Sequence, residues 1–449
     1  MLSNLALMPN ILLVNPWIHD FAAYDFWAKP MGLLTLGALL RTQGFNVFYI
    51  DCLDRFHPES PPADLKARYG RGPYRKTPIP KPIGFKDIAR RYSRYGIDPA
   101  WFRNDLLALP KPDIILMTSL MTYWYPGIQE TIHIIRETLP KTPIVLGGIY
   151  ASLCHDHALS HCPADHVVQG PGEDQLLNIM DRLTGNKAEW KIDINDLDHR
   201  PYPAYDLQTK IPYVPLLTSI GCPYTCTYCA SRILNPTRKQ RQPASVVEEI
   251  QFWHKQHKVE DFVFYDDALL VNAENHIIPF LEALVRLKLK VRFHTPNAIH
   301  IREINPSIAQ LMYEAGFKTL RLGLESGDFD HRDQLDRKVM IHEFNRAVSY
   351  LKSAGFQKEQ IGAYLLAGLP DQSIQSLVTS IQMVKNSGIT PVLAYYSPIP
   401  HTALWEKAVE VSRYDLPSDP IYTNNTIFPC QKEPFSWPAL SRLKDLASK

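Results

Sequence analysis

The chain has 449 residues, of which 45% are hydrophobic and 21% are charged, and its formal net charge is +2. This length predicts two or three globular domains. So small a net charge gives no reason to expect electrostatic attraction of the whole protein to nucleic acid or to an anionic membrane. Seven cysteines without regular pairing favour a reducing compartment. The first 14 residues read as a strand rather than a signal peptide, and no apolar run of about 18 residues is present. We therefore expect a cytoplasmic protein without a membrane segment.

Short apolar runs alternate with helical patterns over residues 1–185. The expected strands are residues 10–15, 46–51, 113–118, 143–148 and 166–170, and the expected helices are residues 29–40, 127–139 and 173–183. This alternation predicts an α/β domain with a doubly wound, Rossmann-like parallel sheet. Ligands of such sheets bind beyond the carboxyl ends of the strands. The candidate binding residues there are Asn15, Pro16, Thr118, Ser119, Gly147 and Gly148.

An insertion at about residues 55–109 is rich in proline, basic and aromatic residues. The near-neutral chain and the lack of a nucleic-acid motif count against a nucleic-acid partner. Two hypotheses stay open: a solvated insertion packed on the neighbouring domain, or a cover of the active site that binds an acidic substrate group. Farther on, His155, His157 and His161 cluster near two cysteines, but their spacing matches no metal motif, and we expect solvated or capping histidines.

Residues 186–212 contain several prolines and few apolar residues, which predicts an interdomain linker. It is followed by an apolar run, residues 216–220, and then by Cys222, Cys226 and Cys229 in C-x3-C-x2-C spacing. A loop this tight can direct three thiolates at one face of an iron–sulfur cube. The loop offers no fourth cysteine, so one iron would stay open to a small molecule.

Zinc is the alternative metal for this loop. Structural zinc sites take four ligands, usually from two C-x2-C-like pairs or from one pair and two distant histidines. The other cysteines of the chain, Cys52, Cys154, Cys162 and Cys430, form no second pair of this kind. The spacing therefore favours a cluster over zinc.

The expected barrel covers residues 213–400, with a C-terminal extension at residues 401–449. Its expected strands are residues 216–220, 261–267, 291–296, 319–325, 361–368 and 391–396, separated by helices at 245–256, 275–287, 307–315, 342–354 and 373–386. Ser245 and Glu248 form a capping-box pattern at the start of the first helix. Six strand–helix units are too few for a closed barrel of eight and predict an open, partial one. Polar residues at the strand ends are Asp266, Asp267, His294, Asn297, Glu325, Ser326 and Tyr396.

The three cysteines, with Tyr228 before the last of them, resemble the signature of radical S-adenosylmethionine (SAM) enzymes. The resemblance implies a [4Fe–4S] cluster whose open iron is chelated by the amino and carboxylate groups of SAM. Electron transfer from the reduced cluster would then cleave SAM to a 5′-deoxyadenosyl radical. It also implies the (β/α)6 partial barrel, with Asp266 and Asp267 near the amino group of SAM. Glu325 and Ser326, in the fourth-strand motif, would lie near its ribose or methionine part.

Several residues in this half keep alternative interpretations. The two aspartates could instead cap the following helix, and Glu325 could pair with Arg321. Arg292 and Arg321 could serve the carboxylate of SAM or form internal salt bridges. Cys430 could be a hydrogen donor or a cluster ligand, although a buried thiol is the simpler interpretation.

The first domain resembles the cobalamin-binding domain that precedes many radical SAM domains. The matching segments are residues 29–34, 145–148 and 165–173, and the last of these contains Gly170. The D-x-H-x-x-G motif, whose histidine binds below cobalt, is absent because Cys52, Leu53 and Asp54 follow Asp51. The resemblance therefore implies cobalamin without a histidine lower ligand. The alternative is a domain that keeps the fold and binds nothing.

Relatives with this architecture are mostly methyltransferases acting on unactivated carbon or phosphorus, so the first hypothesis is a cobalamin-dependent radical methyltransferase. A second is a radical enzyme catalysing a rearrangement, oxidation or cyclisation. A third is a non-catalytic iron–sulfur electron-transfer protein. The implied partners are a small-molecule or peptide substrate and a reductant such as flavodoxin or ferredoxin. Nothing in the sequence names the substrate.

Overall fold

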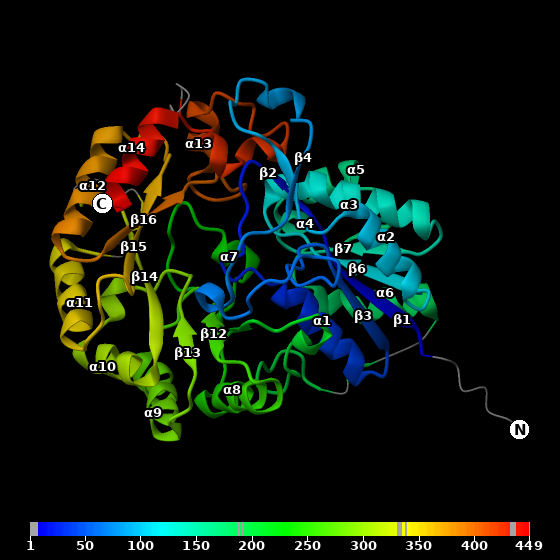
Figure 1. The fold of residues 1–449 in the computed structure, drawn as a ribbon, viewed down its shortest axis with the longest axis horizontal. Helices are drawn as coiled ribbons and strands as arrows, with labels where there is room; N and C mark the ends of the chain where they lie inside the picture. Colours follow the sequence, from blue (N-terminus) through cyan, green and yellow to red (C-terminus); the bar gives the residue numbers. More distant parts are fainter. Residues whose placement is uncertain are drawn as a thin grey trace, which may run out of the picture. The chain divides into compact units, whose positions relative to one another are not determined.

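The computed structural model describes residues 8–185, 189–190, 192–329, 335–336, 339–431 and 437–448 (Figure 1). The chain divides into two compact units, with the boundary between Ile211 and Pro212. The finer division expected from the sequence, with a linker at 186–212 and a separate extension from 401, remains a prediction. Among the described helices, none is long and apolar enough to cross a membrane.

The first unit is built on a parallel sheet of five strands in the order β3-β1-β6-β7-β8. The strands are β1 (Asn10–Asn15), β3 (Asn46–Asp51), β6 (Ile114–Met117), β7 (Ile144–Leu146) and β8 (His166–Val167). The accompanying helices are α1 (Met31–Thr42), α2 (Pro99–Ala108), α3 (Tyr125–Thr138), α4 (Ile149–Leu153), α5 (His155–His161) and α6 (Gly172–Thr184). The chain steps from β1 to β3 on one side and then returns to β6 on the other. The expected doubly wound sheet is therefore confirmed, with its switch point between β1 and β6.

Two strands of the insertion and one strand from the segment after β1 form a second, antiparallel sheet in the first unit. Its order is β2-β5-β4, with β2 (Ile18–Asp20), β5 (Ser93–Tyr95) and β4 (Lys76–Pro78). Tyr74 and Tyr95 are buried against Ile18 and Leu53. The aromatic residues of this sheet thus form a small core. A role of the insertion in covering the active site remains a prediction.

The second unit carries a parallel sheet of six strands in the order β16-β15-β14-β13-β12-β9. The strands are β9 (Val214–Leu216), β12 (Asp261–Phe264), β13 (Arg292–His294), β14 (Phe317–Glu325), β15 (Ile361–Ala367) and β16 (Thr390–Tyr395). Within the described chain, β9 and β16 each pair with one neighbour only, so the sheet is open, as expected. Phe262, Phe264, Phe293 and Phe317 pack ring against ring in its core.

Six longer helices accompany this sheet, and two shorter ones are α7 (Ser231–Leu234) and α13 (Trp405–Val411). The longer ones are α8 (Pro243–His257), α9 (Ile277–Leu287), α10 (Pro306–Ala315), α11 (Ile341–Ser353), α12 (Ile374–Asn386) and α14 (Trp437–Ser448). Local sequence sets several ends: the Asn305 side chain accepts from Ile308 N at the start of α10, and Gly316 ends it in the left-handed conformation. The capping box at Ser245 is wrong. Pro243 starts α8 two residues earlier, because proline suits the first helical position.

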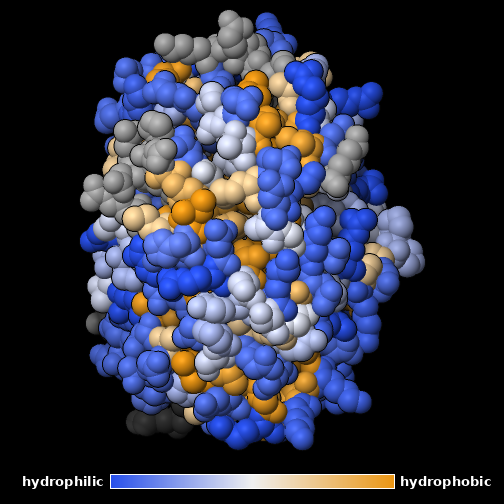
Figure 2. Space-filling view, turned by 90° about the vertical axis from the view of Figure 1, so that its left-hand side faces the viewer, coloured by the Kyte–Doolittle hydropathy of each residue, from blue (hydrophilic) through white to orange (hydrophobic). Residues whose placement is uncertain are grey.

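Figure 2 shows one face of the molecule, on which hydrophilic residues cover most of the surface and hydrophobic residues appear between them in groups. Such a mixture is usual for a globular protein, because polar side chains are too few to cover it completely.

Candidate functional site

The carboxyl edge of the first unit's sheet gathers the binding residues expected there. Asn15 ends β1, Thr118 and Ser119 follow β6, and Gly147 and Gly148 follow β7. Gly170 comes three residues after β8. All of them therefore lie at the edge where doubly wound sheets bind ligands.

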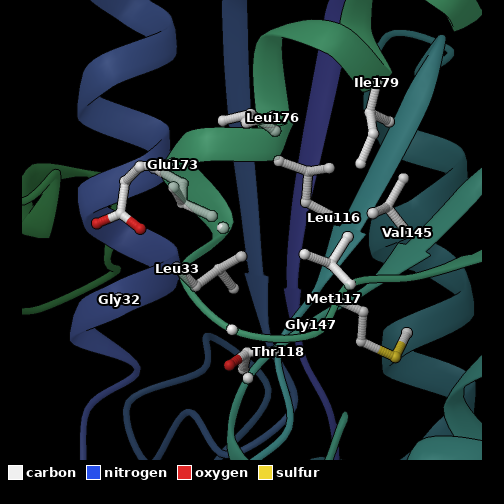
Figure 3. Close-up of a pocket in the computed structure, with 15 residues that line it drawn as sticks. Gly32, Leu33, Leu116, Met117, Thr118, Val145, Gly147, Glu173, Leu176 and Ile179 are labelled. Atoms are coloured by element: carbon white, nitrogen blue, oxygen red, sulfur yellow. The ribbon is translucent and has the colours of Figure 1, made fainter. Parts of the chain in front are cut away.

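A cavity of about 160 Å³ opens at this edge between the sheet, α1 and α6 (Figure 3). Its walls are mainly aliphatic, from Leu33, Leu36, Leu116, Val145, Leu176 and Ile179. The rest of the lining consists of Met117, Val168, two polar residues, Thr118 and Glu173, and five glycines: Gly32, Gly147, Gly148, Gly170 and Gly172. A Cβ atom added to Gly32 or Gly170 would meet no atom within 4 Å, and one added to Gly147 would touch only Val168, at 4.0 Å. These glycines therefore leave room that side chains would fill.

Ser119 and Gly148 have a structural part at this edge. The Ser119 hydroxyl donates to Gly147 O at 2.7 Å and accepts from Ala151 N at 3.2 Å. Gly148 has φ +99°, and a Cβ there would come within 2.3 Å of Ser119 O. Only glycine suits this position, and the serine fastens the two loops together.

Asn15 lines a second, smaller cavity of about 60 Å³, together with Lys29 and Leu53. Its amide donates to Asp51 Oδ1 at 2.7 Å, and Lys29 Nζ lies 3.4 Å from Asp51 Oδ2. Burial lowers the pKa of Lys29, but the charges of Asp51 and Asp25 outweigh this and raise it, so the ammonium stays charged. Sequence reasoning missed this buried network. The one signal for it in the sequence was Lys29, the first residue of the segment 29–34 that resembles the cobalamin-binding domain.

Leu53 occupies the position of the histidine in the D-x-H-x-x-G motif. Its side chain is buried against Ile18, Tyr74 and Tyr95. Asp51 is retained and accepts a hydrogen bond from the backbone N–H of Leu53 at 2.9 Å. The loop after β3 thus keeps its aspartate but presents a hydrocarbon side chain where an imidazole would stand.

The cysteine loop of the second unit connects the two strands of a short antiparallel hairpin. The hairpin pairs β10 (Ser219–Ile220) with β11 (Lys239–Gln240). Gly221 opens the loop at φ +80°, and a Cβ there would lie 3.1 to 3.3 Å from atoms of Asn235, Thr237 and Arg238. This close approach requires glycine before the first cysteine.

The three thiols differ in exposure: Cys226 is buried, Cys222 is half-buried and Cys229 is exposed. The backbone N–H of Ser231 lies 3.4 Å from Cys229 Sγ. Among the described residues, no three His, Cys, Asp or Glu side chains come together as ligands of one metal ion. A [4Fe–4S] cluster requires a wider spacing of ligands than one metal ion does, because each thiolate binds a different iron of the cluster.

Asp266 and Asp267 hold the two ends of this loop. Asp266 accepts from Thr218 Oγ1 at 2.7 Å and Ser219 Oγ at 2.8 Å, before the cysteines. Asp267 accepts from Ser231 Oγ at 2.5 Å, after them. Burial raises the pKa of Asp266, while the hydrogen bonds from Thr218 and Ser219 oppose the shift. Both carboxylates therefore support the loop, and their contact with SAM remains a prediction.

Glu325 ends β14 in a strained conformation, with φ +62° and a register shift against β15. Its side chain is buried, and its charge contributes to raising the pKa of Tyr228, after burial as the main cause. Non-glycine residues with positive φ gather at functional sites. Ser326 lines a cavity of about 380 Å³ with Asp328, Asp371, Gln372 and Lys407. The structure thus brings Tyr228 and Glu325 close to each other. It places Ser326 at a cavity whose lining also includes Leu335 and Leu404, both hydrogen-bonded to Thr227 of the cysteine loop.

Other strand-end candidates have structural partners. His294 is fully buried and bonds Asp261 Oδ1 and Thr319 Oγ1, both at 3.0 Å. Arg292 forms two 2.7 Å hydrogen bonds to Asp261. Asn297 donates to Tyr265 O at 2.7 Å. His294 and Arg292 thus share Asp261 as a structural partner.

Cys430 and Tyr396 are buried in one apolar cluster, against which Tyr228 also packs. Burial raises the pKa of Cys430 to about 12. In the first unit, His155 and His161 each approach a backbone carbonyl of their own helical region, and His157 bonds the Tyr150 hydroxyl at 2.7 Å. These contacts fit structural roles.

Comparison with known proteins gives a family for both halves of the chain. The B12 binding domain model matches residues 102–180, and the Radical SAM superfamily model matches residues 216–384. The anaerobic magnesium-protoporphyrin IX monomethyl ester cyclase of Rubrivivax gelatinosus is 24% identical over 66% of this chain and 58% of its own length. An uncharacterized methyltransferase of Pyrococcus horikoshii is 24% identical over 66% of this chain and 70% of its own length. The chain thus spans little more than half of the cyclase.

Two solved structures are similar over most of this chain. The radical SAM methyltransferase TsrM from Kitasatospora setae, solved with cobalamin and a [4Fe–4S] cluster, matches with a TM-score of 0.65 and 16% identity, covering 90% of this chain and 78% of that one. The cobalamin-dependent radical enzyme OxsB matches with a TM-score of 0.60 and 14% identity, covering 93% of this chain and 57% of that one. At these identities the likeness shows the fold. Together with the two family models, it identifies the chain as a member of the radical SAM enzymes that carry a B12-binding domain.

Proposed function

We propose that this radical SAM enzyme is a cobalamin-dependent methyltransferase that acts on an unactivated carbon or phosphorus centre of a small molecule or peptide. The observation that carries the proposal is the glycine-lined cavity at the switch point of the first unit. This room supports a bound ligand over the alternative of a domain that keeps the fold and binds nothing. TsrM, which shares both folds, is described as a methyltransferase.

The residues present fit the three cofactors. Thiolates are the ligands of iron–sulfur clusters, and Cys222, Cys226 and Cys229 would hold one on a loop fixed by aspartates at both ends. Glycine backbone at the carboxyl edge would allow close approach of cobalamin. When bound, the cluster with SAM would supply a radical that removes a hydrogen atom, and cobalamin would carry the methyl group.

The chain's own residues would place these groups and exclude water. Asp266 and Asp267 would hold the two ends of the cysteine loop, and the buried, strained Glu325 would stand near Tyr228 of that loop. Leu53 offers cobalt no nitrogen, so we propose that cobalamin binds without a histidine below the metal. An electron would come from a reductant such as flavodoxin or ferredoxin.

The first test is cofactor content after anaerobic purification from cells supplied with cobalamin. About four irons and one cobalt per chain are expected. The electron paramagnetic resonance spectrum of the Co(II) form should show no splitting from a histidine nitrogen below cobalt. Four irons without cobalt would refute the cobalamin half of the proposal.

The reaction itself is tested with SAM that carries a deuterated methyl group, incubated with reduced enzyme and small-molecule or peptide extracts. A methyltransferase of this kind consumes two SAM molecules and yields S-adenosylhomocysteine, 5′-deoxyadenosine and a labelled product. The second candidate, a non-methylating cyclisation, oxidation or rearrangement, is favoured by the similarity to the cyclase. It would give 5′-deoxyadenosine without S-adenosylhomocysteine or label.

A further inference from the structure

Arg238 stands directly behind the cysteine loop. It precedes β11, and its Cα lies 3.3 Å from the position that a Cβ of Gly221 would take. The guanidinium Nη2 donates to Val271 O at 3.2 Å, in the segment that follows Asp266 and Asp267. The side chain therefore spans from the first cysteine to the loop after β12.

Most of the hydrogen-bonding capacity of Arg238 is unused. Within the described chain, Val271 O is the one acceptor of its side chain, and its buried Nε has no partner. A guanidinium has five N–H donors arranged for a carboxylate. Burial lowers the pKa of Arg238, while Asp266 and Cys222 act in the opposite direction, which places both groups near it. A half-buried cation with unused donors is suited to an anionic ligand.

The two arginines that the sequence offered for the SAM carboxylate are placed differently. Arg292 bonds Asp261 through two nitrogens and lies 3.2 Å from Glu260. Glu260 directly precedes β12 and Asp261 is its first residue, so both carboxylates lie at the amino end of this strand. Arg321 lies within β14 and donates to Leu320 O at 2.9 Å.

We infer that Arg238 binds the carboxylate of SAM. Because SAM chelates the cluster through its amino and carboxylate groups, this carboxylate has to lie beside the cysteine loop, where Arg238 stands. The inference rests on the radical SAM half of the proposed function and is independent of methyl transfer. Its ligand is an α-amino acid carboxylate, and its contact is a charge-assisted, fork-shaped hydrogen bond.

The test compares two ligands on enzyme with a reconstituted cluster. SAM and decarboxylated SAM are measured by anaerobic equilibrium dialysis with wild-type enzyme, Arg238→Gln and Arg238→Lys. Arg232→Gln is the matched control, since Arg232 is an exposed residue of α7 after the same loop. Iron per chain is counted for each protein.

Arg238→Gln should weaken SAM binding about 10- to 100-fold, the range for hydrogen bonds to a charged group. Decarboxylated SAM should be affected less than about twofold, because the lost partner is absent from it. Arg238→Lys should lose less, and Arg232→Gln should match wild type. Equal weakening of both ligands, unchanged SAM binding, or loss of iron in both Arg238 variants would refute the inference. Wild-type enzyme that binds SAM but transfers no methyl group would instead refute the proposed function alone.

Discussion

Gly32 gives the most direct test of the cobalamin cavity. It is the second residue of α1, its backbone is helical, and a Cβ added there would enter open space in the cavity. Alanine at this position should therefore be free of clash. It should stabilise the cofactor-free chain by up to about 1 kcal/mol, because glycine costs more backbone entropy in a helix. Leucine should extend farther into the 160 Å³ space.

We expect Gly32→Leu to lower cobalamin affinity at least about tenfold, equivalent to about 1.4 kcal/mol. The cofactor-free leucine variant should be no less stable than wild type, since its side chain gains apolar burial against Leu33 and Leu36. Stability and cobalamin binding should thus change in opposite directions, which separates blocking from misfolding. Gly32→Ala should retain most of the cobalt.

The assay is cobalt and iron per chain after anaerobic purification at limiting cobalamin, together with thermal unfolding of cofactor-free protein. The iron content should stay constant across the series, because the cysteine loop belongs to the other unit. Full cobalt in Gly32→Leu would show that this cavity does not take the cofactor.

Three further predictions concern the cluster, a buried ion pair and an acidic group. Cys226→Ala should reduce iron from about four per chain to near zero, whereas Cys430→Ala should keep it; equal loss in both would make Cys430 a cluster residue. Lys29→Met leaves Asp51 buried without its cation and should cost about 3–5 kcal/mol in urea unfolding, while Lys29→Arg should cost less. Burial would raise the pKa of Asp261, but hydrogen bonds from neighbouring guanidinium and imidazole groups outweigh it and lower the pKa. The stability from its charged form is therefore complete above its ordinary value of 3.8 and is lost as the pH falls below it. Asp261→Asn should flatten this acid limb, and superimposable stability curves for the two proteins would contradict the assignment.

Local patterns in the sequence were enough for the fold class and the cysteine loop. Buried parallel strands appear as continuous apolar runs, and the helices between them have their own period, so their alternation indicates a doubly wound sheet and an open barrel. Three cysteines within eight residues need no tertiary information to be recognised as a set. The absence of a histidine after Asp51 is likewise visible from the order of residues.

The function of single polar residues depended on neighbours that are distant in the sequence. Asp266 reads as a free carboxylate at a strand end, yet its partners Thr218 and Ser219 lie 48 and 47 positions away. His294 reads the same way but is paired with Asp261 inside the sheet. The sequence pattern predicts which residues lie at the edge of a sheet. The hydrogen-bond partners of those residues come from other segments of the chain, so the pattern does not reveal them.

The cavity, the inserted sheet and Arg238 were decided by tertiary structure alone. Gly32 and Gly170 are 138 positions apart and meet only because α1 and the loop after β8 cover the same sheet edge. β2 pairs with β5 across more than 70 residues, including α1 and β3, and no local periodicity in the sequence predicts this pairing. Arg238 carries no motif, and its position behind Gly221 follows from the pairing of two short strands. The physical reason is the same in each case: burial and pairing depend on which segments the fold brings together, and this information is not local.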